Sequence, residues 1–198
     1  MADVNRMSAL EDHYDEGEFG AVEDTPGVFL AEQRPSAIVQ VNGAPAEDKL
    51  HELFSLNAPP SVRRVWFDGS NEVLWNGPGK WIWVSNFENP TELVSNLCHK
   101  FSPTQATITD LSHARTVVRV EGEWAVDVLC KGCPADIEVM STDDCMATLV
   151  GTISTLVHCR EARFVFDLYV FRSFGLAFWE WISDAALEFG YKVPVQMR

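Results

Sequence analysis

The alternation of apolar and polar residues along the chain predicts a protein built mostly of short β-strands. Each predicted strand is rich in β-branched and aromatic residues and is bounded by turn residues such as Asn-Gly, Asp-Gly or Gly-Pro-Gly. Two of them are expected within residues 72–85, where Gly-Pro-Gly breaks the pattern. The others are predicted at residues 37–43, 62–68, 104–112, 115–122, 147–159 and 163–172, and the pair 104–112 and 115–122 is expected to form a hairpin.

Three segments instead have the spacing of amphipathic helices. Residues 89–101 begin with Asn-Pro and then place Leu93, Leu97 and Phe101 on one face, which is typical of a helix with its start signal. A second helix is predicted at residues 123–131. The third is expected over residues 173–190, with Ser173 as its N-cap and Gly190 as its C-cap.

The order strand, strand, helix therefore occurs three times. Successive β-β-α units of this kind predict the α+β class, in which they form a mixed sheet with helices packed on one face. This domain is expected to span residues 36–198.

Residues 1–35 have a different composition. The first 24 residues contain eight acidic side chains against Arg6 alone, which is half of the chain's formal charge of -14. Little apolar periodicity follows, so the sequence predicts an acidic arm that is poorly ordered or wraps a partner.

The overall charge also limits the function classes. The chain has 29 acidic and 15 basic residues and no basic cluster, which argues against binding nucleic acid or an anionic membrane surface. The amino terminus lacks the apolar core of a signal peptide, and the five cysteines are an odd number, so we expect a cytoplasmic protein with reduced thiols.

Cys130 and Cys133, in LCKGCP, have the spacing of dithiol redox sites and of half a zinc site. They flank the expected carboxyl end of the second helix, where Gly132 is expected as a left-handed cap and Pro134 ends the helix. At this end the helix dipole disfavours a thiolate. A structural helix end is the preferred interpretation, and a zinc module using Cys130 and Cys133 remains the alternative.

Other catalytic motifs are missing from the sequence. It contains no G-x-G-x-x-G, no Walker A motif and no G-x-S-x-G, which leaves flavin, nicotinamide, nucleotide and hydrolase functions without support. Three residues near the carboxyl end are candidates for partner contacts. Arg172 lies between the last long strand and the last helix, and Trp179 and Trp181 lie on different sides of that helix, so that both are not expected to face one core.

A resemblance to a known family is carried by four segments of the sequence: GPGKWIWV, RTVVRVEGEWAVDVLCKGCPADIEV, CMATLVGTISTLVHC and FDLYVFRSFGLAFWEWISDAALEFG. Over residues 60–192 the chain resembles the gamma subunit of heterotetrameric sarcosine oxidase, whose fold is related to the folate-binding aminomethyltransferases. The resemblance implies a non-catalytic subunit without a cofactor, assembled with alpha, beta and delta subunits. Those subunits are expected to carry FAD, FMN, NAD, zinc and tetrahydrofolate.

The flavoprotein complex of that family belongs to one-carbon metabolism. It is an oxidoreductase that demethylates sarcosine to glycine, transfers the one-carbon unit to tetrahydrofolate or releases formaldehyde, and forms hydrogen peroxide. A complex acting on another N-methyl amino acid is an alternative. The kinship also implies a second alternative, a folate-binding aminomethyltransferase in which Asp136 is catalytic; the resemblance places Gly122, Ala125, Leu129 and Asp136 at comparable positions.

Overall fold

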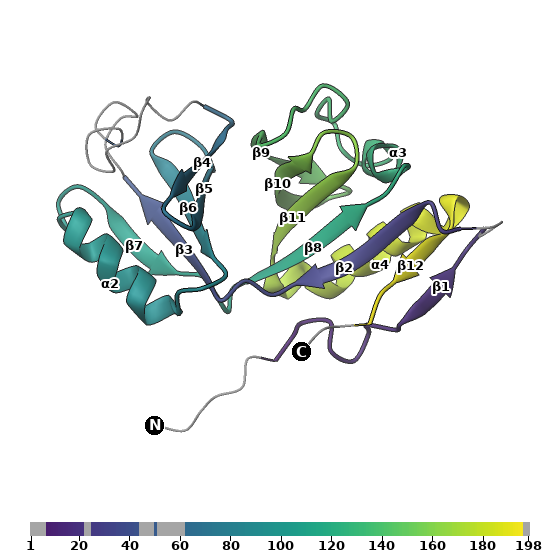
Figure 1. Ribbon diagram of the computed structural model, residues 1–198, viewed down its shortest axis with the longest axis horizontal. Coiled ribbons are helices and arrows are strands. Elements are labelled where there is room, and N and C mark those ends of the chain that lie inside the picture. Colours follow the sequence, from purple (N-terminus) through teal and green to yellow (C-terminus); the bar gives the residue numbers. More distant parts are fainter. Residues whose placement is uncertain (1–6, 22–24, 44–49, 51–61, 196–198) are drawn as a thin grey trace.

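The computed structural model describes residues 7–21, 25–43, 50 and 62–195 and arranges them around two β-sheets (Figure 1). The larger sheet has seven strands in the order β1-β12-β2-β8-β11-β10-β9, and the smaller has five in the order β4-β5-β6-β3-β7. All neighbouring strands are antiparallel except β12 and β2. The strands of the larger sheet are β1 (Gly17–Phe19), β2 (Val28–Gln33), β8 (Arg115–Glu121), β9 (Cys145–Val150), β10 (Ile153–Glu161), β11 (Val165–Phe171) and β12 (Tyr191–Val193).

The smaller sheet and the helices complete the predicted α+β class, which is confirmed. The sheet consists of β3 (Ala37–Asn42), β4 (Val65–Asp68), β5 (Asn71–Trp75), β6 (Lys80–Ser85) and β7 (Thr107–Asp110). The helices whose bounds lie within the described residues are α2 (Pro90–Lys100), α3 (Ala125–Cys130) and α4 (Gly175–Ala186), with 3-10 turns η1 (Arg172–Phe174) and η2 (Leu187–Phe189) on either side of α4. Each long helix follows a pair of strands, as the repeated β-β-α pattern predicts.

Two details of strand pairing differ from the sequence prediction. β7 and β8 do not pair with each other, because β7 adds to β3 in the smaller sheet while β8 pairs with β2 and β11 in the larger one. The predicted strand 147–159 is a hairpin of β9 and β10, since Gly151 adopts a φ of +59° and reverses the chain.

Three apolar cores bury both faces of both sheets. Successive side chains of a strand point to opposite faces, so Val118 packs toward α3 and α4 while its neighbour Val117 packs toward the smaller sheet. On β6, Trp83 packs on the side of α2, and Ile82 packs on the side of the larger sheet. The molecule therefore has four layers, with the sheets inside and the helices outside (Figure 1).

The ends of the helices follow their sequence signals only in part. α2 begins with the capping box of Asn89 and Glu92, and Pro90 occupies its first turn. Ser173 is not the N-cap of α4, because it lies inside η1 and Phe174 takes the cap position without a side-chain hydrogen bond. The segment ends at Gly190, with a φ of +65°, as predicted.

The prediction that residues 1–35 form a poorly ordered arm is wrong for the part of this segment that the structure describes. β1 pairs with β12, and β2 lies between β12 and β8. Leu10 is fully buried in the core of the larger sheet together with Val28 and Leu30. Short apolar segments between the acidic residues thus supply the edge strand β1, the inner strand β2 and core contacts, so the described part of this segment belongs to the larger sheet. The suggestion that this segment contacts a partner stays a prediction.

Candidate functional site

The cysteine pair lies at the carboxyl end of α3, as the sequence predicts. Cys130 is the last residue of the helix and is exposed, while Cys133 is half-buried in the following turn. Partial burial and the nearby carboxylates of Glu138 and Asp127 raise the pKa of the Cys130 thiol. A raised pKa keeps the sulfur protonated, whereas a redox nucleophile needs the thiolate.

Gly132 does not form the expected left-handed cap. A glycine is needed here because two other segments approach its backbone closely. A Cβ at this position would lie 2.3 Å from Cζ2 of Trp181 and 2.8 Å from the backbone nitrogen of Gly151. The same Gly151 N–H donates a hydrogen bond of 3.0 Å to the carbonyl of Gly132. The glycine between the two cysteines therefore joins α3 to the β9–β10 hairpin under the ring of Trp181.

Asp136 lies four residues beyond Gly132 in the loop from α3 to β9. Its side chain is exposed, while the next residue, Ile137, is buried in the core. In the described part of the chain, no group of three or more His, Cys, Asp and Glu residues is placed to hold a metal ion, so Cys130 and Cys133 have no third ligand there.

A buried network of charges, which the sequence patterns did not reveal, lies between the two sheets. Asp167 on β11 is 1% exposed and accepts two hydrogen bonds from Arg119, of 2.7 and 2.9 Å, and one of 2.6 Å from Arg160. Arg160 also donates to both carboxylate oxygens of Glu72 on β5, in the other sheet. Burial by itself would raise the pKa of Asp167, but the two guanidinium groups hold it below its usual range. These residues interrupt otherwise apolar strands, and their charges are satisfied by one another.

His158, near this network on β10, is also buried, with 1% of its surface exposed. Among the described residues neither ring nitrogen has a hydrogen-bond partner, and Nε2 lies 3.9 Å from Oδ1 of Asp143. Burial, aided by the positive charge of Arg160, lowers the pKa of His158 to about 3. The imidazole is therefore neutral near pH 7.

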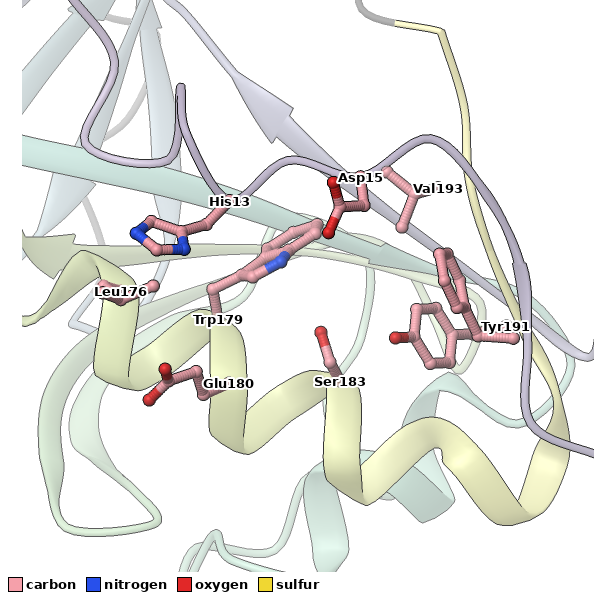
Figure 2. A pocket seen from close by; sticks show the side chains of 9 residues that line it. His13, Asp15, Leu176, Trp179, Glu180, Ser183, Tyr191 and Val193 are labelled. Atoms are coloured by element: carbon pink, nitrogen blue, oxygen red, sulfur yellow. The ribbon is translucent and has the colours of Figure 1, made fainter.

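The hollow in Figure 2 lies between α4, β12 and the segment that precedes β1. Its volume is about 200 Å³. Three aromatic rings, two carboxylates, two aliphatic side chains, one histidine and one serine line it; the lining residues are His13, Asp15, Phe19, Leu176, Trp179, Glu180, Ser183, Tyr191 and Val193. Sequence analysis missed this site because residues 13–19 belong to the segment that was expected to be a separate arm.

The two tryptophans of α4 both pack on the core of the larger sheet, so the expectation that they cannot is wrong. Trp179 is 6% exposed and stacks on Tyr14, with ring centroids 5.3 Å apart. Trp181 is half-buried and covers the glycines of the cysteine turn and the hairpin. Tyr14, from the segment before β1, thus covers a side of Trp179 that the sequence pattern predicted to be free for a partner.

Arg172 is half-buried at the end of β11, and its Nη1 donates a hydrogen bond of 2.6 Å to the carbonyl of Met7. Three large apolar side chains near it are exposed: Met7 by 63%, Phe171 by 42% and Phe174 by 51%. We call Met7, Phe171, Arg172 and Phe174 the Arg172 surface. Whether it contacts another chain stays a prediction.

None of the helices in the described ranges is long and apolar enough to cross a membrane.

Comparisons with known proteins agree with this architecture. A scan against protein-family models finds no match. The fold is that of an aminomethyltransferase: the glycine cleavage system aminomethyltransferase T from Bartonella henselae superposes with a TM-score of 0.63 at 12% identity, over 85% of this chain and 48% of that one.

A second protein is similar over nearly its whole length. The chain is 29% identical over 152 residues to the sarcosine oxidase subunit gamma of Corynebacterium sp. (strain U-96), which covers 75% of this chain and 73% of that protein. A chain of the heterotetrameric sarcosine oxidase from Corynebacterium sp. U-96, solved in complex with pyrrole 2-carboxylate, superposes with a TM-score of 0.78 at 24% identity, over 93% of this chain and 96% of that one. The predicted resemblance to the gamma subunit of heterotetrameric sarcosine oxidase is confirmed.

Proposed function

We propose that this chain is the gamma-type, non-catalytic subunit of a heterotetrameric sarcosine oxidase and assembles with alpha, beta and delta subunits. The observation that carries the proposal is the similarity to a gamma subunit in both sequence and fold. The sequence similarity covers 75% of this chain and 73% of that protein, and the structural similarity covers 93% of this chain and 96% of the other. The complex would oxidatively demethylate sarcosine to glycine in the cytoplasm and form hydrogen peroxide.

The division of labour follows from the same similarity. FAD, FMN, NAD, zinc and tetrahydrofolate would be bound by the other subunits, and the one-carbon unit would leave as methylene-tetrahydrofolate or formaldehyde. This chain would supply a contact surface for the other subunits and a rigid fold that supports that surface. Its buried charges support that role, because Arg119, Arg160, Asp167 and Glu72 bind one another across the two sheets.

The Arg172 surface supports the assembly role. Large exposed apolar side chains that lie together beside a charged group are typical of protein–protein interfaces, and arginine and aromatic residues are enriched there. We assign this surface to contact with a flavoprotein subunit of the same complex.

Co-purification tests the proposal. The chain, tagged at its carboxyl end, is expressed with and without the other three subunits of its own complex, and subunit stoichiometry, bound flavin and sarcosine-dependent hydrogen peroxide are measured. We expect one copy of the chain in an active complex, and neither flavin nor turnover in the chain alone. Sarcosine turnover by the isolated chain, or an active complex that assembles fully without it, would contradict the proposal.

A pair of matched variants locates the contact. Phe174→Ser changes the Arg172 surface, and Phe87→Ser changes an exposed residue of the loop after β6. The first should reduce recovery of the complex, and the second should leave it unchanged. Equal recovery with both variants would refute the assignment of this surface while leaving the subunit proposal to the stoichiometry measurement.

The aminomethyltransferase alternative is tested with the same preparation. Tetrahydrofolate binding by the isolated chain that is lost in Asp136→Ala would favour it. No binding by the isolated chain is expected from a gamma-type subunit.

A further inference from the structure

The hollow of Figure 2 has the chemistry of a cation site. Phe19, Trp179 and Tyr191 contribute three of its walls, and the carboxylates of Asp15 and Glu180 lie at its edge. Aromatic faces attract positively charged groups through the ring quadrupole, and a carboxylate adds a charge-assisted hydrogen bond to an ammonium N–H. Apolar walls alone would suit a neutral ligand, and carboxylates alone would suit a hydrated metal ion.

Each aromatic ring of the hollow is held in place by stacking on another ring. The ring of Phe19 stacks on that of Tyr191, with centroids 5.1 Å apart, and Trp179 stacks on Tyr14 at 5.3 Å. Because these rings belong to β1, β12, α4 and the segment just before β1, the hollow exists only when β1 and β12 have joined the larger sheet. A ligand would therefore meet a preformed site, which reduces the entropy lost on binding.

The charge balance around the hollow favours a cation. Its lining includes two carboxylates and no lysine or arginine. The nearby Lys192 is bound to Glu18 at 2.9 Å and thus does not neutralise Asp15. The lining segment itself lies in the acidic stretch of residues 11–18, which contains five Asp and Glu residues and no Lys or Arg.

A polar atom in the floor of the hollow lacks a partner. Oγ of Ser183 is buried and makes no hydrogen bond within the described residues. In Figure 2 this hydroxyl points from α4 toward the space between Trp179 and Tyr191. A polar ligand group that enters the hollow can give this oxygen a hydrogen-bond partner, and satisfying a buried polar atom favours binding.

We propose that this hollow binds an alkylammonium group, with the nitrogen at Asp15 and the attached methylene groups between Trp179 and Tyr191. Its volume of about 200 Å³ is below the roughly 300–1,000 Å³ of sites for drug-sized ligands, so the group has only a few heavy atoms. A small free amine and a lysine side chain of a neighbouring subunit present the same chemistry. The proposal does not depend on the assignment of the chain as a gamma-type subunit.

Titration of the full chain with n-butylammonium tests the site. The chain is labelled with ¹⁵N, and the indole N–H signal of Trp179 is identified by its loss in Trp179→Phe. We expect a saturable shift of this signal with n-butylammonium and none with n-butanol, which has a similar shape and no charge. An equal shift with both compounds, or no shift with either, would refute the proposal.

Variants test the assigned contacts. Asp15→Asn keeps the size of the side chain and removes its charge, and it should weaken binding about 3- to 30-fold, a range between the loss of an exposed ion pair and the loss of a hydrogen bond to a charged group. Glu11→Gln is the matched control, since Glu11 lies in the same acidic segment outside the lining, and should bind as the parent does. Equal affinity in Asp15→Asn and the parent would contradict the assigned position of the nitrogen.

The assembled complex distinguishes the two sources of the cation. If a neighbouring lysine occupies the hollow, n-butylammonium should bind the isolated chain and fail to bind the complex, and Asp15→Asn should reduce complex recovery. If a free amine is the ligand, binding should persist in the complex. Either result supports the site, whereas an isolated chain that fails to bind refutes it.

Discussion

His158 should make the protein less stable in mild acid. The folded pKa of about 3 lies well below the ordinary value of 6.5 for histidine, because burial disfavours the imidazolium. Between these values the unfolded chain binds a proton that the folded chain does not, so the free energy of unfolding falls as pH decreases from about 6.5 toward 3. At pH 5 the pH is about 1.5 units below the pKa of the imidazole in the unfolded chain. The free energy of unfolding is therefore about 2 kcal/mol lower than at pH 7.

His158→Phe removes this titration and the unpaired ring nitrogens together. The free energy of unfolding is measured by urea titration at pH 7 and pH 5, followed by tryptophan fluorescence, for the parent, His158→Phe and the exposed control His99→Gln. Acidic side chains elsewhere lower the stability of all three proteins, so the difference between variants is the decisive quantity. The parent and His99→Gln should each lose about 2 kcal/mol more than His158→Phe. A parallel loss in all three would refute the assignment of a buried, neutral imidazole.

Three further predictions concern the core and the cysteine turn. Asp167→Asn should lower the free energy of unfolding by about 3–5 kcal/mol, because it leaves two partly buried guanidinium groups without their shared carboxylate; a loss below 1 kcal/mol in urea titration would show that the network is dispensable. Gly132→Ala should lower the melting temperature, since its Cβ would lie 2.3 Å from Trp181, and Trp181→Phe should restore part of the loss; a Gly132→Ala protein as stable as the parent would contradict the close approach. Cys130→Ser/Cys133→Ser should leave both the zinc content, measured by atomic emission, and the melting temperature unchanged, and stoichiometric zinc that disappears in the variant would restore the zinc-module alternative.

Local patterns were sufficient to predict most of the elements. The Asn-Pro start and the apolar positions at 93, 97 and 101 identified α2 because capping and helical spacing depend on neighbouring residues alone. The strand pairs before α2 and before α4 were likewise recognised from runs of β-branched and aromatic residues. The α+β class followed from these elements and their order, whereas the resemblance to the sarcosine oxidase gamma subunit was carried by the residues of particular segments such as CMATLVGTISTLVHC.

Pairing between distant segments could not be predicted in this way. Residues 104–112 and 115–122 look like a hairpin because they are adjacent, yet hydrogen bonding to β3 and β2 takes them into different sheets. Residues 28–30 are apolar but lie in an acidic context, so their place beside β8 was missed. The hollow was missed for the same reason, since Asp15 and Tyr191 are distant in sequence and meet only in the folded chain.

The path of the chain through the two sheets has a consequence for its synthesis. The smaller sheet is built entirely from strands between residues 37 and 110, whereas the larger one uses strands from both sides of that interval, and β12 is inserted between β1 and β2. As the polypeptide leaves the ribosome, every strand of the smaller sheet emerges before β8, and β2 must wait for residues 115–193 to find its two neighbours. The nascent chain thus carries an unmatched strand edge until residues 191–193 have emerged, and loss of these residues would leave β1 without a neighbour in the sheet.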